Sequence, residues 1–118
     1  TLGTGIGGAF IYNGVLIPNA ELGHIDIGEH QDYEKYASNL VREKKELSWK
    51  HWAARLQPYY ATLEKLFSPD LFVVGGGVSK HADKYLPLLE IETPIVPATL
   101  RNTAGIVGAA LQGLEDLV

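Results

Sequence analysis

Three consecutive glycines directly after an apolar run constrain the fold of this chain more than any other feature. Leu71-Phe72-Val73-Val74 is typical of a buried strand, Gly75-Gly76-Gly77 follows it, and Ser79 begins a helix that we expect to reach about Leu89. Strand, glycine turn and helix together form the βα unit of a parallel or mixed sheet. A further short strand is expected at 94–97. The sequence therefore predicts an α/β protein with a parallel or mixed sheet flanked by helices.

The first part of the chain predicts a two-stranded hairpin followed by a polar region. Residues 9–12 and 15–17 are apolar runs rich in β-forming residues, and the Asn13-Gly14 pair between them is a strong hairpin signal. Residues 19–31 alternate polar and apolar side chains, which suits a short strand that enters a polar loop. The charged residues 32–46 predict a helix and a solvated loop.

The longest helix is expected after Ser48, a plausible N-cap, because apolar residues recur at spacings of three and four up to Phe67. Pro58 lies inside this pattern, so we expect a kink or a break between two helices there. Trp49 and Trp52 could form a stacking platform for a sugar or base, but at helical spacing they favour the core. A closing helix is expected over 104–117.

Composition narrows the class of protein. The 118 residues and 12.9 kDa correspond to one domain or part of one, and the 46% of hydrophobic residues can close a core. Ten basic and 14 acidic side chains give a net charge of −4, which argues against general binding to nucleic acid. The absence of cysteine removes disulfides, thiolate zinc sites and cysteine nucleophiles, and it favours the cytoplasm. No segment predicts a membrane span, and we expect a C-terminal fragment of a longer protein.

Two glycine-rich loops are candidates for phosphate binding. Gly3, Thr4 and Gly5 combine close backbone approach with amide and hydroxyl donors, although the same residues suit a strand-edge turn. Gly76 and Gly77 lie where a helix begins after a buried strand, which favours anions, although a tight βα turn also needs glycine. The G-x-x-x-x-G-K-[ST] pattern is absent, so a standard P-loop is excluded.

A polar cluster between these loops suits sugar binding. Glu21 and His24 are three residues apart beside a glycine, and Glu34 begins an i, i+4 pair with Ser38 on the next expected helix. Carboxylates and imidazole can hold sugar hydroxyls in fixed directions. A solvated polar loop is the simpler interpretation. A metal site is a further alternative, although its possible ligands have no recognised zinc spacing: His24, His30, Asp26 and Glu29.

Several basic residues are candidates for a strip that binds an anionic polymer. A solvated helix face is favoured, because Glu43 and Glu46 surround two of the lysines. The basic residues concerned are Lys44, Lys45, Lys50, Arg55 and Lys80.

The chain resembles the ROK sugar kinases (repressor, open reading frame, kinase), and within them the bacterial polyphosphate glucokinases. The resemblance covers nearly the whole chain and rests on motifs in the right order: Thr1 to Gly7, Glu21-Leu22-Gly23-His24, Glu34 to Ser38, Ser68 to Lys80, Thr93 to Ala98 and Asn102 to Leu111. It implies the two-lobed actin-like ATPase fold (ribonuclease H-like), with residues 1–118 as most of the C-terminal lobe and the N-terminal lobe outside this chain.

The resemblance also implies roles for individual residues. Glu21 and His24 match a sugar-binding pair, and Glu34 matches a further glutamate that holds a sugar hydroxyl. Gly3, Thr4 and Gly5 fall in a phosphate-contacting loop, and Gly76 and Gly77 lie near the nucleotide or polyphosphate. The catalytic aspartate of the family lies upstream of the motif at which this chain begins, so no catalytic residue and no turnover are expected from the chain alone. The cysteines that hold a structural zinc in many relatives are absent, and we expect no zinc.

The implied reaction is transfer of a phosphoryl group from polyphosphate or ATP to the 6-hydroxyl of glucose, with mannose as another acceptor and Mg²⁺ bridging donor oxygens. A homodimer of the full-length protein is implied, with no nucleic acid or membrane as partner. Two alternatives remain: a sugar-responsive repressor with a separate DNA-binding domain, and a sugar-binding module without chemistry.

Overall fold

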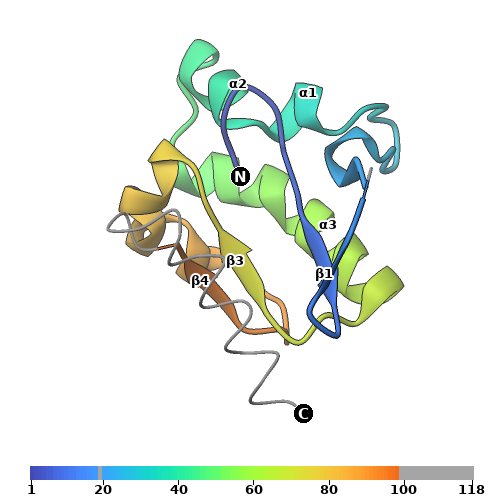
Figure 1. Cartoon of the computed structure of the whole chain (residues 1–118). Helices are drawn as coiled ribbons and strands as arrows, with labels where there is room; N and C mark the ends of the chain where they lie inside the picture. The colour runs from blue at the N-terminus through green and yellow to red at the C-terminus, as the bar shows by residue number, and fades with distance from the viewer. Residues whose placement is uncertain (19, 99–118) are drawn as a thin grey trace.

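The computed structural model describes residues 1–18 and 20–98. Figure 1 shows the long helix α3 (Trp49–Phe67) running diagonally through the centre of the view, with the short helices α1 (Glu34–Ala37) and α2 (Asn39–Lys44) above it. The strands are β1 (Phe10–Tyr12), β2 (Val15–Ile17), β3 (Phe72–Val74) and β4 (Ile95–Pro97), and 3₁₀ segments occur at Leu22–His24, Gly77–Lys84 and Leu86–Leu88. The helix predicted for 104–117 lies outside the described residues.

The hairpin prediction is confirmed. β1 and β2 pair antiparallel with Phe10 opposite Ile17, and the turn residues Asn13 and Gly14 have φ of 51° and 75°. Positive φ at both turn positions matches the right-handed twist of the flanking strands, and asparagine and glycine are the residues that tolerate it best. The local sequence therefore determines this element.

The strands expected at 71–74 and 94–97 are also confirmed, as β3 and β4. β3 and β4 are parallel, with Phe72 opposite Ile95 and Val74 opposite Pro97. The described strands form two separate two-stranded sheets, so a single mixed sheet is not seen within residues 1–18 and 20–98.

The helix predicted from Ser79 to Leu89 is wrong in type. This segment forms 3₁₀ turns over Gly77–Lys84, interrupted by a kink at His81, and over Leu86–Leu88, with Tyr85 between them at a φ of −133°. The Tyr85 side chain is fully buried, and its hydroxyl donates to the carbonyl of Val78 at 3.2 Å. Pro87 follows in the second segment and lacks a backbone N–H. Burial of the tyrosine and the proline together prevent a regular α-helix.

Helix α3 is the longest helix among the described residues. Ser48 caps it as predicted, because its hydroxyl accepts from the backbone N–H of His51 at 3.1 Å. Of the kink or break expected at Pro58, a break is not seen, since α3 is one continuous helix. A proline inside a helix costs about 3 kcal/mol, whereas each large apolar side chain buried on either side contributes about 1.5–3 kcal/mol. The buried side chains of α3 are Trp52, Ala53, Leu56, Tyr59, Tyr60 and Leu63.

Buried polar contacts fasten α1 to α3. The indole Nε1 of Trp52 donates to the carbonyl of Ala37 at 2.9 Å, and the hydroxyl of Tyr33 donates to the carbonyl of Arg55 at 2.7 Å. Arg55 in turn donates to the carbonyl of Tyr36 at 2.9 Å and stacks over its ring. Trp52 is fully buried, which confirms the core interpretation of this tryptophan. These contacts fix the position of the residues around Glu34.

The polar region before α1 differs from its prediction. The strand expected within 19–31 is wrong, because Leu22–His24 forms a 3₁₀ turn and Ile27 makes one isolated bridge with His30. The helix and loop expected over 32–46 become two short helices, with Ser38 as the N-cap of α2. No helix in the described ranges combines the length and apolarity that a bilayer crossing requires.

Candidate functional site

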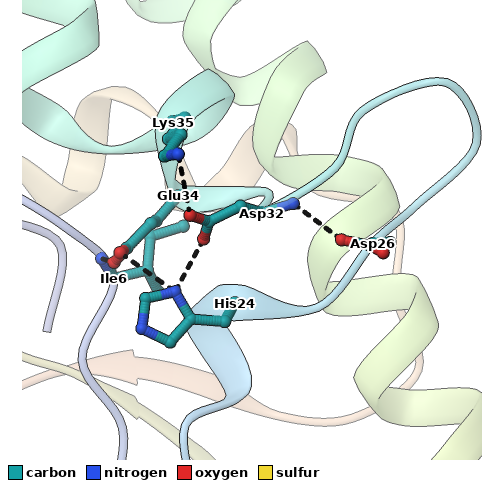
Figure 2. A network of polar contacts seen from close by, with 6 residues as sticks. All are labelled: Ile6, His24, Asp26, Asp32, Glu34 and Lys35. Atoms are coloured by element: carbon teal, nitrogen blue, oxygen red, sulfur yellow. Dashed lines mark hydrogen bonds and ion pairs between the residues drawn. The ribbon is translucent and has the colours of Figure 1, made fainter.

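Three polar side chains from one loop and α1 meet in a cluster that we call the His24 cluster, composed of His24, Asp32 and Glu34. Figure 2 shows the imidazole of His24 facing both carboxylates. Its Nδ1 lies 2.7 Å from Oδ1 of Asp32 and 3.3 Å from Oε1 of Glu34. The His24 side chain is 54% exposed, whereas Asp32 and Glu34 are 26% and 23% exposed. The cluster therefore has an anchored inner part and an imidazole open to solvent.

Asp32 is held by contacts on both sides (Figure 2). Its backbone N–H donates to Oδ1 of Asp26 at 2.7 Å, and its Oδ2 lies 3.4 Å from Nζ of Lys35. Its φ of 52° is in the left-handed region, which aspartate tolerates better than most residues. This turn directs the Asp32 carboxylate back toward His24.

The two partners shift each other's ionisation. The hydrogen bond that the imidazole donates to Asp32, followed by the charges of Asp32 and Glu34, raises the pKa of His24 above its ordinary 6.5. The same hydrogen bond lowers the pKa of Asp32 below its ordinary 3.8. Because Nδ1 faces the carboxylates, the proton of a neutral His24 is favoured on Nδ1. The Nε2 atom then remains available to accept a hydrogen bond from a ligand hydroxyl.

Glu34 links the His24 cluster to the glycine loop at the start of the chain. Its Oε2 accepts from the backbone N–H of Ile6 at 2.8 Å. A Cβ on Gly5 would collide with this same oxygen. Glycine at this position therefore lets the loop approach the carboxylate closely.

Gly23 meets the same loop from the other side. A Cβ on Gly23 would collide with the backbone carbonyl oxygen of Ile6. Because that obstacle is backbone and not a flexible side chain, a larger residue at Gly23 would force the chain itself to move. Close packing against the backbone of Ile6 thus explains why a glycine stands between Glu21 and His24.

The two glycine loops lie side by side. The backbone N–H of Leu2 donates to the carbonyl of Gly75 at 3.2 Å, and Gly76, with φ of 94°, packs against the backbone of Leu2. The hydroxyl of Ser79 donates to the carbonyl of Gly76 at 2.7 Å and stabilises the turn. The segments predicted to bind phosphate are therefore brought together.

A pocket of about 320 Å³ opens between the two loops and α2. We call it the loop pocket. Both loops and α2 contribute to its lining, which consists of Leu2, Gly3, Asn39, Arg42, Glu43, Gly77, Val78, Lys80 and His81.

The predicted site residues divide into two groups in space. His24 and Glu34 are adjacent, and Gly5 closely approaches Glu34. Gly3 and Gly77 line the loop pocket, next to Gly76. Thr4 is exposed between Gly3 and Gly5.

Glu21 is less closely engaged. Its side chain is exposed and makes no hydrogen bond to the turn that it precedes. Its charge contributes to the raised pKa of His24, after the larger effects of Asp32 and Glu34. Glu21 therefore lies at the edge of the cluster, with its carboxylate open to solvent.

The sequence analysis did not select Asp32, which belongs to the His24 cluster, or Arg42, which lines the loop pocket. Asp32 could have been suspected because it stands two residues before Glu34, but its left-handed turn is not visible in the sequence. Two of the residues considered as metal ligands make other contacts. His30 stacks on Tyr36 with ring centroids 3.6 Å apart, and Oδ1 of Asp26 accepts a hydrogen bond from the backbone N–H of Asp32. Within the described residues, the ligand atoms of the His24 cluster lie within 4.8 Å of one another.

Comparison with known proteins supports the kinase class. The structure of an inorganic polyphosphate/ATP-glucomannokinase from Arthrobacter sp. strain KM matches with a TM-score of 0.81 and 56% identity. The match covers 99% of this chain and 46% of that protein. The chain therefore has the fold of the corresponding part of this kinase, and the predicted actin-like ATPase class is confirmed.

Sequence relatives carry a more particular name. The polyphosphate glucokinase of Mycobacterium tuberculosis is 50% identical over 98% of this chain and 43% of its own length. That of Mycobacterium leprae is 46% identical over 99% of this chain and 36% of its own length. The chain is thus a homologue of polyphosphate glucokinases and spans less than half the length of these relatives. No family model matches the sequence.

Proposed function

We propose that this chain is the C-terminal lobe of a ROK-type glucokinase that transfers a phosphoryl group from polyphosphate or ATP to the 6-hydroxyl of glucose. The observation that carries the proposal is the hydrogen bond between Ile6 and Glu34, because it joins the candidate sugar site to a candidate phosphate loop. Kinase chemistry requires this proximity of acceptor and donor. The names of the relatives support the same reaction.

In this proposal, Glu21, His24 and Glu34 orient the sugar. The free Nε2 of His24 accepts from one hydroxyl when the ring is neutral and donates to one when it is charged, while Glu34 keeps unused lone pairs on both oxygens beside its bonds to Ile6 and His24. Glu21, exposed at the edge of the cluster, can accept from a further hydroxyl. Asp32 acts through His24 and is a positioning residue. Holding several hydroxyls at once fixes which one faces the donor.

The glycine loops hold the donor. Gly3 and Gly77 line the loop pocket, Gly76 allows a close approach to the backbone of Leu2, which also lines it, and Gly5 allows the loop to approach Glu34. Thr4 exposes its hydroxyl between Gly3 and Gly5. We place no general base in this chain. The base is expected in the part of the protein that corresponds to the rest of its relatives, so the isolated chain should show no turnover.

We propose that Mg²⁺ binds together with the phosphate donor. Among the residues that line the loop pocket, only Glu43 offers a carboxylate, and it faces Arg42 at 3.8 Å. These residues do not form a protein-held Mg²⁺ site, which fits a cation that is carried mainly by phosphate oxygens and water.

A cytoplasmic location and a homodimer of the full-length protein stay predictions.

A coupled assay for sugar 6-phosphate tests the proposal. The full-length protein is supplied with glucose or mannose and with polyphosphate or ATP, and this chain alone serves as the control. Turnover by the full-length protein and none by the chain is the expected result. Glucose binding without turnover would instead identify a sugar-binding module, and absence of both would overturn the sugar assignment.

A further inference from the structure

The polar loop before α1 is attached to the helices by three stacked side chains that we call the Tyr36 stack: His30, Tyr36 and Arg55. The rings of His30 and Tyr36 are nearly parallel, at 17°, with centroids 3.6 Å apart. The guanidinium carbon of Arg55 lies 4.1 Å from the same Tyr36 centroid. Two groups this close to one ring would overlap if they shared a face, so Tyr36 lies between His30 and Arg55. The Tyr36 stack therefore joins the loop to α1 and α3.

We propose that the Tyr36 stack positions Asp32, and through it His24, so that His30 and Tyr36 are positioning residues for sugar binding. This inference rests on the proposed function, and it assigns a role to two residues outside the His24 cluster.

His30 stands at the tip of a loop that is closed by its own hydrogen bonds. Ile27 and His30 pair through two backbone hydrogen bonds of 2.9 and 3.0 Å. Closer to α1, Oδ1 of Asp26 accepts from the backbone N–H of Asp32 at 2.7 Å. These bonds give the loop its shape, and the ring of His30 attaches its tip to α1. A displacement of the tip should therefore be passed along the loop to Asp32.

The backbone of Asp32 is the sensitive point of this loop. Its φ of 52° is a conformation that residues other than glycine keep only where the surrounding structure imposes it. With this backbone, Oδ1 of Asp32 lies 2.7 Å from Nδ1 of His24, and Figure 2 shows the two side chains facing each other. Release of the loop tip would let the backbone relax and turn the carboxylate away from the imidazole.

Tyr36 is suited to hold the loop because its own position is fixed. Its carbonyl accepts from the guanidinium of Arg55 at 2.9 Å, and its ring meets that of Tyr33 edge to face, with centroids 5.5 Å apart. Tyr33 is buried, whereas His30 is exposed. The Tyr36 stack is thus anchored in the core at one end and carries the loop at the other.

Kinetics of the full-length protein test the inference. His30→Ala removes the stacking ring from an exposed position, so the fold should be kept. We expect the KM for glucose to rise about 5-fold, as loss of one aromatic contact should give, while the KM for the phosphate donor stays within about 2-fold. His30→Phe keeps a flat ring and should restore the glucose KM. His51→Ala, which removes an exposed histidine from α3, is the matched control.

An NMR titration of His24 in the full-length protein gives a measurement that does not depend on turnover. Asp32, Glu34 and Glu21 hold the pKa of His24 above 6.5, with Asp32 as the largest cause. If the carboxylate of Asp32 turns away, this pKa should fall toward 6.5 in His30→Ala and return in His30→Phe. Tyr36→Leu removes the other ring of the contact and should lower the same pKa.

The outcomes separate the two proposals. Absence of turnover by the unaltered full-length protein with either donor overturns the proposed function, and the His24 titration alone then decides on the Tyr36 stack. An unchanged glucose KM or an unchanged His24 pKa in His30→Ala overturns the role of the stack and leaves the kinase function standing. Equal increases in the glucose and donor KM values, or a His30→Phe variant that behaves like His30→Ala, have the same consequence.

Discussion

The backbone N–H of Ile6 donates a 2.8 Å hydrogen bond to Oε2 of Glu34, a residue 28 positions further along the chain. Glu34 stands in the first turn of α1, which Tyr33 and Trp52 fasten to α3. The position of the glycine loop is therefore coupled to the candidate sugar site through the Glu34 carboxylate. Any change that displaces this carboxylate should alter sugar binding without requiring a change at the sugar itself.

Substitution of Gly5 tests this relationship most directly. A Cβ at Gly5 would collide with the end of the Glu34 side chain, which can rotate away, so Gly5→Ala should keep the fold. We expect the KM for glucose to rise about 10-fold, as loss of one charged hydrogen bond would give. Gly8→Ala is the control, because a Cβ at Gly8 meets nothing within 4 Å. Equal glucose KM values for the two variants would contradict the proposed role of Glu34.

Gly23 should behave differently, because its neighbour is the backbone of Ile6. Gly23→Ala must move main chain, and overpacking of this kind costs about 1–3 kcal/mol. We expect a lower midpoint of thermal unfolding together with weaker glucose binding. The measurement is thermal denaturation of the full-length protein beside Gly8→Ala. An unaltered midpoint would show that the loop and the turn can separate freely.

The attachment of α1 to α3 can be weakened without removing apolar volume. Burial raises the pKa of Tyr33 to about 12, so its hydroxyl stays a donor to the carbonyl of Arg55 at working pH. Tyr33→Phe should cost about 0.5–1.5 kcal/mol of unfolding free energy, more if the carbonyl stays unpaired. Urea denaturation followed by tryptophan fluorescence measures this loss. Tyr12→Phe, at an exposed position of the hairpin, should leave the unfolding midpoint unchanged.

The sequence predicted elements whose signals are local. Asn13-Gly14 specifies its turn, and Ser48 caps α3 with its own hydroxyl. It failed where packing decided the outcome. Pro58 does not break α3 because buried side chains lie on both sides, and Tyr85 interrupts an expected helix by turning into the core.

The candidate site shows the same division. His24 and Glu34 could be selected by residue type and by family resemblance. Asp32 could not, because its role depends on a left-handed turn and on the hydrogen bond from its backbone N–H to the Asp26 carboxylate. The loop pocket was equally hidden, since Arg42 and Lys80 meet only after the glycine loops come together.

Replacement of Pro58 should stabilise the protein, in contrast to the substitutions of Gly23 and Tyr33. Pro58 is exposed in the interior of α3 and provides no backbone donor for the carbonyl of Ala54. Pro58→Ala should restore this helical hydrogen bond and stabilise the protein by about 2 kcal/mol, allowing for the greater freedom of the unfolded chain. Thermal denaturation measures the gain, and Ala54→Gly, which weakens the same turn, should lower the midpoint. A destabilised Pro58→Ala variant would show that the proline ring itself is required.

The ionisation of the His24 cluster gives the last prediction. Because the pKa of His24 is raised above 6.5, the stabilisation from its charged form is complete below pH 6.5 and is lost as pH rises through the raised value. The lowered pKa of Asp32 means that its contribution is present above pH 3.8 and is lost as pH falls through the lowered value. The pair therefore stabilises the fold most between these limits. Asp32→Asn removes the main cause of the His24 shift, so an NMR titration of the full-length protein should show the pKa of His24 falling toward 6.5, with any pH-dependent step in the glucose KM moving with it. Asp70→Asn, at an exposed carboxylate, should leave the His24 titration unchanged, and the same titration in Asp32→Asn as in the unaltered protein would refute the coupling.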